Sequence, residues 1–306
     1  MITETEQPLA PPREYESEEL QNARKLDRLG RTIEVLITVK TSPQPSTKYG
    51  DTVCVAGLAL DPLRWVRLYP IRFRHLEQSN QFTKYEIVKV PVSNSAEDNR
   101  IESLKVEADK IERVRALPTR NGWIERAQII EHIGLTTLCE LQREVRNNID
   151  APSLGMIEPI LETFRVIVKP GKGWTPRQKE KLEKEWNQET LDLGLPQVKN
   201  PPILESRPVD VWLSFKCCAD CKYGHTIGFL DWEATGLMRR EQANGFEAME
   251  RIIKERFEAN PSKPGKNLRI FVGNQSDPTK RGSFEALGLY YPDKSAVVEA
   301  ARPKLF

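Results

Sequence analysis

The stretch TIEVLITVK, from Thr32 to Lys40, carries the first clear β-strand signal of the chain. It is mostly apolar and rich in β-branched residues, which is typical of a strand packed in a sheet. Further strands are expected at residues 52–60, 65–69 and 85–92, with the tight turn DPLR between the second and the third. Residues 101–106 and 111–114 extend the pattern. The sequence therefore predicts a small β-rich, barrel-like module of about five strands over residues 30–120.

Helical spacing of apolar residues replaces this pattern from residue 123 onward. We expect a helical connector over residues 121–204, including a charged helix that starts at Thr175-Pro176. Residues 205–306 combine strands at 209–215, 268–272 and 284–290 with an amphipathic helix at 245–258. The predicted fold class is α+β, with a mixed α/β module at the C-terminal end. The acidic, proline-rich residues 1–29 are predicted to be a flexible tail.

Composition narrows the classes of function. The 306 residues include 46 basic and 44 acidic side chains, so any contact with nucleic acid must come from a local basic patch. Five cysteines, three of them clustered, do not resemble a disulfide framework and favour a reducing, cytoplasmic location. No apolar run approaches the length of a membrane span, so no membrane partner is expected.

The stretch FKCCADCKYGHTIGFLDWE, from Phe215 to Glu233, predicts a metal site. Cys218, Cys221 and His225 form C-x2-C-x3-H, a spacing that lets soft ligands converge on one zinc ion. The fourth position is open to Cys217, to Cys54, to a carboxylate or to water. A water ligand would make the site catalytic in type, whereas four protein ligands would make it structural. A cysteine loop without metal is the alternative.

Two carboxylates close this stretch. If residues 231–233 continue a strand, Asp231 and Glu233 share one face and form a candidate catalytic pair for a metal-dependent hydrolase or nuclease. The alternative is a solvated strand end. Whether the chain catalyses a reaction stays open at this point.

Arginines alternate with aromatic residues in RWVRLYPIRFRH, residues 64–75. Guanidinium groups bind phosphate bidentately, and aromatic rings offer stacking faces for bases. The candidate contacts to nucleic acid or a nucleotide are Lys40, Trp65, Arg67, Tyr69, Arg72 and Arg74. An edge strand protected by arginines is the competing interpretation.

The strings KTSPQPSTKYGDTVCVAGL, WVRLYPIRFR and CADCKYGHTIGFLDWE, with RIFVGNQ and ALGLYYP, resemble a widespread bacterial family of uncharacterised proteins. The resemblance spans residues 34–292 and implies no particular activity. The leading prediction is a protein that binds nucleic acid or a nucleotide and carries a structural zinc. The alternatives are the hydrolase and a module that binds a protein partner.

Overall fold

The computed structural model describes residues 17–46, 50–96, 98–148, 150–189 and 202–302 of the chain. Most of the predicted flexible tail, residues 1–16, lies outside the described residues. Its last part forms helix α1 (Glu18–Leu29), whose N-cap Ser17 accepts a hydrogen bond from the backbone N–H of Leu20.

The N-terminal half is a small β-barrel, as predicted. Its strands are β1 (Arg31–Lys40), β2 (Gln44–Ser46), β3 (Gly50–Leu60), β4 (Leu63–Ile71), β5 (Glu86–Asn94), β6 (Ser103–Val106) and β7 (Glu112–Ala116). The order β1-β3-β4-β6-β5 closes because β5 also pairs with β1. The neighbours pair antiparallel except β4 and β6, which run parallel. Strand β2 adds to β3, and β7 adds to β5.

Strand β1 is apolar along most of its length because both of its faces are covered. Val35 and Ile37 point into the barrel core. Leu36 and Val39 belong to a second cluster that includes Met156 and Phe271 of the C-terminal half. The unbroken apolar run in the sequence therefore reflects a barrel wall that also docks against a neighbouring domain.

The C-terminal half is mixed α/β. Its strands are β8 (Leu154–Ile157), β9 (Arg165–Pro170), β10 (Val209–Phe215), β11 (His225–Gly228), β12 (Arg269–Asn274) and β13 (Phe284–Tyr290). They form two antiparallel sheets, ordered β11-β10-β9 and β13-β12-β8, which a parallel bridge between Phe229 and Ala286 connects. Residues 121–204, expected to be a helical connector, thus supply strands β8 and β9.

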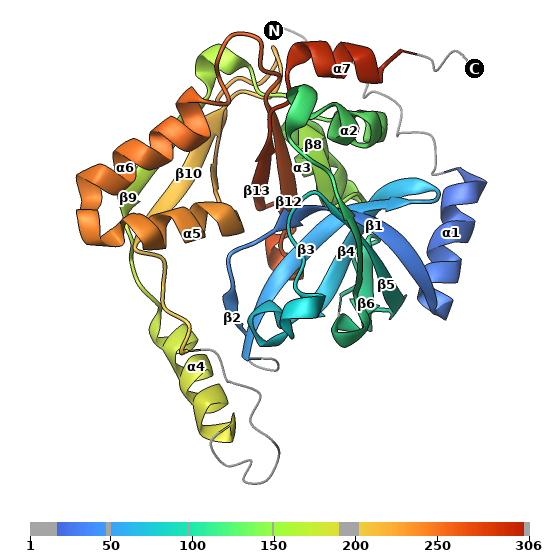
Figure 1. Cartoon of the computed structure of the whole chain (residues 1–306), viewed down its shortest axis with the longest axis horizontal. Helices are drawn as coiled ribbons and strands as arrows, with labels where there is room; N and C mark the ends of the chain where they lie inside the picture. Colours follow the sequence, from blue (N-terminus) through green and yellow to red (C-terminus); the bar gives the residue numbers. More distant parts are fainter. Residues whose placement is uncertain (1–16, 47–49, 97, 149, 190–201, 303–306) are drawn as a thin grey trace, which may run out of the picture.

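The remaining helices are α2 (Arg120–Ile130), α3 (Leu138–Asn147), α4 (Pro176–Glu189), α5 (Trp232–Glu241), α6 (Phe246–Lys254) and α7 (Lys294–Ala300). Most of them lie near these sheets in Figure 1, whereas α4 projects away from them and contacts strands β2 and β3 of the barrel. Helices α5 and α6 lie beside β9 and β10 (Figure 1), where Met238, Met249 and Ile253 enter the domain core. The predicted helix at 245–258 is confirmed, but its last turn is a π-helix at Glu255–Ala259.

Candidate metal centre

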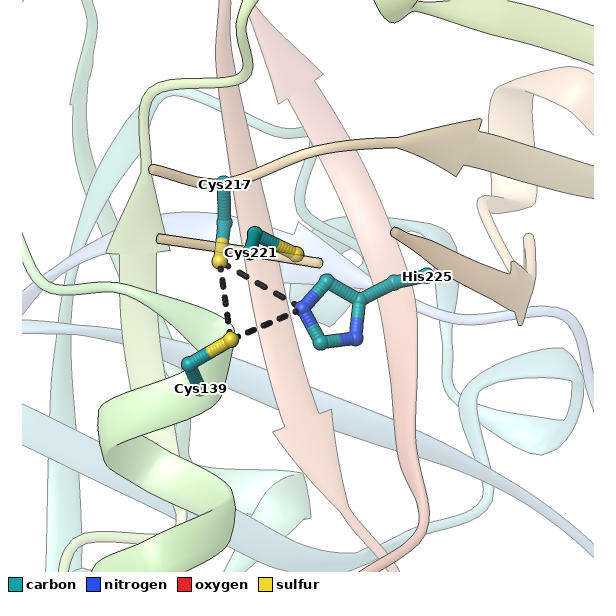
Figure 2. Close-up of side chains that lie close together, drawn as sticks. All are labelled: Cys139, Cys217, Cys221 and His225. Atoms are coloured by element: carbon teal, nitrogen blue, oxygen red, sulfur yellow. Dashed lines mark hydrogen bonds between the residues drawn. The ribbon is translucent and has the colours of Figure 1, made fainter. Parts of the chain in front are cut away.

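Four side chains of the C-terminal half form a Cys3His group. The sulfurs of Cys139, Cys217 and Cys221 and a ring nitrogen of His225 all lie within 4.8 Å of one another. Figure 2 shows Cys139 reaching the group from a helix, while the other three come from the strands and loop opposite. The group could hold a metal such as zinc.

Local structure explains how these residues meet. Strands β10 and β11 pair with Phe215 opposite His225, so Cys217 leaves one strand close to where His225 begins the other. The loop between them turns through a hydrogen bond from the N–H of Cys221 to the carbonyl of Cys218, 3.2 Å long. Cys139 is the second residue of α3, whose start is fixed by a capping box between Thr137 and Glu140.

The distances among Cys139, Cys217 and His225 match those of a tetrahedral zinc site, and the sulfur of Cys221 lies within 4.8 Å of all three ligand atoms. Bonds of about 2.3 Å to sulfur and about 2.0–2.1 Å to nitrogen separate two sulfurs by about 3.8 Å, and a sulfur and a nitrogen by about 3.5 Å. The sulfurs of Cys139 and Cys217 are 3.6 Å apart. Nε2 of His225 lies 3.4 Å from the sulfur of Cys139 and 3.3 Å from that of Cys217. One ion therefore fits between the ligand atoms with little movement.

The electrostatics of the group also suit a cation. Burial, followed by the neighbouring thiols Cys217 and Cys221, raises the pKa of Cys139. Burial likewise raises the pKa of Cys217 and lowers that of His225, which favours a neutral imidazole. Burial also opposes ionisation of Cys221, but hydrogen bonds, first with the backbone of Cys217, lower its pKa. Three crowded thiols ionise together at low cost only when a cation compensates their charge.

This group differs from the one expected from sequence in two ways. Cys218 does not belong to it, although its sulfur is 3.9 Å from that of Cys217, the candidate fourth ligand, which does belong. Cys139 was not a candidate, because it lies 78 residues before Cys217 and no second cysteine lies in its own segment. The one local signal is its place between the helix-capping residues Thr137 and Glu140.

Asp231 lies at a helix start rather than on a strand. It is 1% exposed and caps α5, since its Oδ1 accepts the N–H of Ala234 at 3.0 Å. Its Oδ2 accepts a 2.7 Å hydrogen bond from the buried Lys84 of the barrel. Burial alone would lower the pKa of Lys84, but the carboxylates of Asp231 and then Glu233 raise it above its ordinary value. The predicted pair is thus split, with Asp231 inside and the side chain of Glu233 53% exposed.

Arg67 lies inside the molecule, only 2% exposed, and joins the two domains. Its Nε donates to Oγ of Ser153 at 3.0 Å, and its Nη2 donates to the carbonyls of Ser153 at 2.7 Å and Asn274 at 3.3 Å. Its Nη1 lies 3.4 Å from the sulfur of Cys54. The lack of a side chain at Gly273 makes room, because a Cβ there would be 2.5 Å from Nη2. In this position Arg67 serves protein acceptors and offers no donor to a phosphate.

The other predicted binding residues lie in different settings. Lys40 is 5% exposed, donates to the carbonyl of Phe82 at 3.2 Å, and faces the rings of Phe73 and Trp232 at 3.9 and 4.7 Å. Burial lowers the pKa of Lys40 to about 8. Trp65 is half-buried, with its ring 5.8 Å from that of Phe271 across the domain junction.

Tyr69, Arg72 and Arg74 are partly exposed. Arg72 contacts the ring of His75 at 3.3 Å, and Arg74 forms an ion pair with Asp51. The structure thus buries Lys40 and Arg67, places the half-buried Trp65 at the domain junction, and leaves Tyr69, Arg72 and Arg74 partly exposed.

The molecule therefore has the build of a two-domain protein, a five-stranded β-barrel followed by a mixed α/β domain with a Cys3His group. The chain belongs to the family described as Domain of unknown function (DUF8757), whose model matches residues 134–305. A second family model, described as Domain of unknown function (DUF8758), matches residues 31–132. The comparison with curated proteins finds no match. None of the helices in the described part of the chain is long and apolar enough to cross a membrane.

Proposed function

We propose that the C-terminal domain binds one zinc ion through Cys139, Cys217, Cys221 and His225, and that the ion is structural. The observation that carries the proposal is the convergence of four soft ligands within 4.8 Å of one another, three of them at the spacing of a tetrahedral site. Four protein ligands fill the coordination shell of zinc and leave no position for a water. A catalytic zinc would need such an open position.

A zinc ion at this group would tie two distant parts of the domain together. Cys139 lies on α3, whereas the other three ligands belong to the hairpin of β10 and β11 and its loop. Cys217 and Cys221 are 6% and 3% exposed, so the ion would lie at the edge of the hydrophobic core. Metal binding and folding of the domain are then coupled.

Elemental analysis of the purified chain tests this proposal. We expect about one zinc per chain, and loss of that zinc in Cys221→Ser. Cys218→Ser is the matched control, because its sulfur is close to the group but not part of it. Zinc-free wild-type protein that is folded and does not take up added zinc would refute the proposal.

The hydrolase alternative has less support. Both carboxylate oxygens of Asp231 already have protein partners, Ala234 N–H and Lys84. Within the described ranges, no group of three or more potential metal ligands includes Asp231 or Glu233.

We infer a second candidate function, contact with nucleic acid or a nucleotide, for the barrel-end cluster of Tyr69, Arg72, Arg74 and His75. The partial exposure of these side chains at the end of strand β4 and in the turn that follows supports it. Phosphate would have to compete with Asp51 for Arg74, which predicts weak and salt-sensitive binding.

Binding of labelled single- and double-stranded DNA and RNA at two salt concentrations tests the barrel-end cluster. Arg72→Ala should reduce the dependence of log K on log salt by about one unit for each lost phosphate contact. Arg115→Ala, on the exposed strand β7, is the control. Folded protein that binds none of the four nucleic acids would exclude this candidate.

A further inference from the structure

A cleft of about 600 Å³ lies between helix α5 and the end of α6. Trp232, Glu233 and Arg240 line it from α5, and Glu255, Arg256 and Asn260 line it from the π-helical turn. Its size falls within the range of about 300–1,000 Å³ that is usual for small-molecule sites. The cleft lies apart from the Cys3His group, with which it shares no residue.

Two local departures from regular helix meet at this cleft. Gly236 stands in the middle of α5, where glycine is a poor helix former, and it lines the cleft. A Cβ at Gly236 would meet only Nη1 of Arg240, at 3.8 Å, so protein packing does not require glycine there. On the other wall, α6 passes into the π-helix Glu255–Ala259, a rare conformation that is frequent at functional sites.

Two guanidinium groups and two carboxylates line the cleft. Among the described residues, neither the Arg240 nor the Arg256 side chain has an acidic group within 4.0 Å, and neither side chain takes part in a hydrogen bond there. Glu233 is different, because Nζ of the buried Lys84 lies 3.8 Å from its Oε2. Lys84 is already paired with Asp231 at 2.7 Å, so it offsets the charge of Glu233 only in part. The two guanidinium groups are the cationic groups of the cleft lining that have no ion-pair partner among the described residues.

The apolar part of the cleft is formed in part by an aromatic ring. Trp232 is half-buried, and its ring is held from the barrel side by Phe73 at 5.3 Å and by Lys40 at 4.7 Å. Leu237 and Ile252 add aliphatic surface. An indole in a fixed position beside two guanidinium groups without an ion-pair partner suits a ligand with a flat ring and an anionic group.

We propose that the cleft binds a small organic anion, with its planar ring against Trp232 and its phosphate or carboxylate group on Arg240 and Arg256. Asn260 supplies an amide for a polar atom of the ring or of its substituents. The proposal is independent of the zinc centre.

Equilibrium binding by isothermal titration calorimetry on the full, metal-loaded chain tests the ligand class. The probes are AMP, GMP and 2-naphthoate, and the controls are adenosine, guanosine and inorganic phosphate. We expect saturable binding of at least one of the three ring-bearing anions, and at least ten-fold weaker binding of the uncharged nucleosides and of phosphate alone. Tighter binding of a nucleotide than of 2-naphthoate identifies a phosphate ligand, and the reverse order identifies a carboxylate ligand.

Variants test the location. Arg240→Gln and Arg256→Gln should each weaken binding about ten-fold, since each removes a charge-assisted hydrogen bond. Arg251→Gln is the matched control, because Arg251 is exposed on α6 and does not line the cleft. Gly236→Leu should abolish binding by filling the cleft, while its melting temperature stays at or above that of the wild type because leucine is the better helix former.

Three results would overturn the proposal. The first is no binding of any ring-bearing anion by folded wild-type protein at millimolar concentration. The second is equal binding of the nucleosides and the nucleotides. The third is binding that persists unchanged both in Gly236→Leu and in a variant that combines Arg240→Gln with Arg256→Gln.

Discussion

Replacing Cys139 with serine should remove the metal and destabilise the C-terminal domain, because a metal bridge from α3 to the β10–β11 hairpin depends on this residue. The two ends of the bridge, Cys139 and Cys217, are 78 residues apart. If the metal acts as a cross-link, closing a loop of that length contributes about 4.5 kcal/mol at 25 °C to the free energy of unfolding. For a domain of this size the loss corresponds to roughly 10–18 °C in melting temperature.

Urea unfolding of wild type, Cys139→Ser and the control Cys218→Ser measures this contribution, each with added zinc and with a chelator. The wild type and Cys218→Ser should lose stability when the chelator is added. Cys139→Ser should start at the lower stability and respond little to the chelator. The reasoning fails if Cys139→Ser retains one zinc per chain and unfolds at the same urea concentration as the wild type.

Three further predictions concern buried charges at the domain junction, all measured by urea unfolding. Arg67→Ala should lower the free energy of unfolding by about 3–5 kcal/mol, because it leaves the acceptors at Ser153 and Asn274 without their donor. Replacing an exposed arginine should lower it by less than about 1 kcal/mol, and a loss of that size for Arg67→Ala would argue against its buried position. Asp231→Asn can still cap α5 but leaves Lys84 buried without its carboxylate, and should also cost about 3–5 kcal/mol; stability equal to the wild type would show that Lys84 has another partner. Lys40→Met should remove a pH dependence of stability. The pKa of Lys40 is about 8 in the folded state and 10.5 in the unfolded state, so the unfolded state binds more protons between these two pH values. The stability of the wild type should therefore rise with pH across this window, by at most about 3 kcal/mol relative to the variant. A constant difference between wild type and Lys40→Met from pH 7.5 to 10.5 would contradict the lowered pKa.

The barrel was predictable because its signal is local. Runs of β-branched apolar residues indicate strands such as Thr32–Lys40, and turn residues such as Asp61-Pro62 mark where one strand ends and the next begins. What the run at 32–40 could not reveal is why it is apolar on both faces. That depends on a second domain lying against Leu36 and Val39, which is a property of the tertiary fold.

The metal ligands likewise fall into those that local sequence could predict and one that only the tertiary fold brings in. Cys217, Cys221 and His225 lie within one hairpin, so their proximity follows from sequence spacing. The choice between Cys217 and Cys218 depends on which thiol faces α3, and spacing alone does not specify that direction. Cys139 reaches the group only through packing of α3, which no local pattern encodes.

The strand predicted through residues 231–233 is wrong, although the sequence carries the signal of a helix that starts at Asp231. An aspartate followed by an acidic residue in the first turn and then by helix formers is an N-terminal helix signal, and WEATGLMRRE fits it. The apolar run at 227–230 favoured the strand interpretation, which holds up to Gly228 and ends there.

The arginine-aromatic segment shows why residue type does not determine exposure. Alternation in a barrel strand sends side chains inward and outward, but outward can mean solvent or a neighbouring domain. Arg67 points to the neighbouring domain, so its guanidinium group donates hydrogen bonds across the domain junction instead of to a ligand.

The motifs that carry the family resemblance in the two halves meet each other at this junction. The N–H of Ser42, in the KTSP loop of the barrel, donates to the carbonyl of Leu230 at 2.6 Å, and its hydroxyl forms a hydrogen bond with that of Thr235 on α5. Thr41 forms a bridge with Asp231 in the same place. Buried polar groups destabilise the fold when they lose their hydrogen-bond partners. Separating the two domains would break these hydrogen bonds and leave the groups either exposed to water or buried without a partner. The two domains should therefore unfold as one cooperative unit, and destabilisation of the C-terminal domain on metal loss should also reach the barrel.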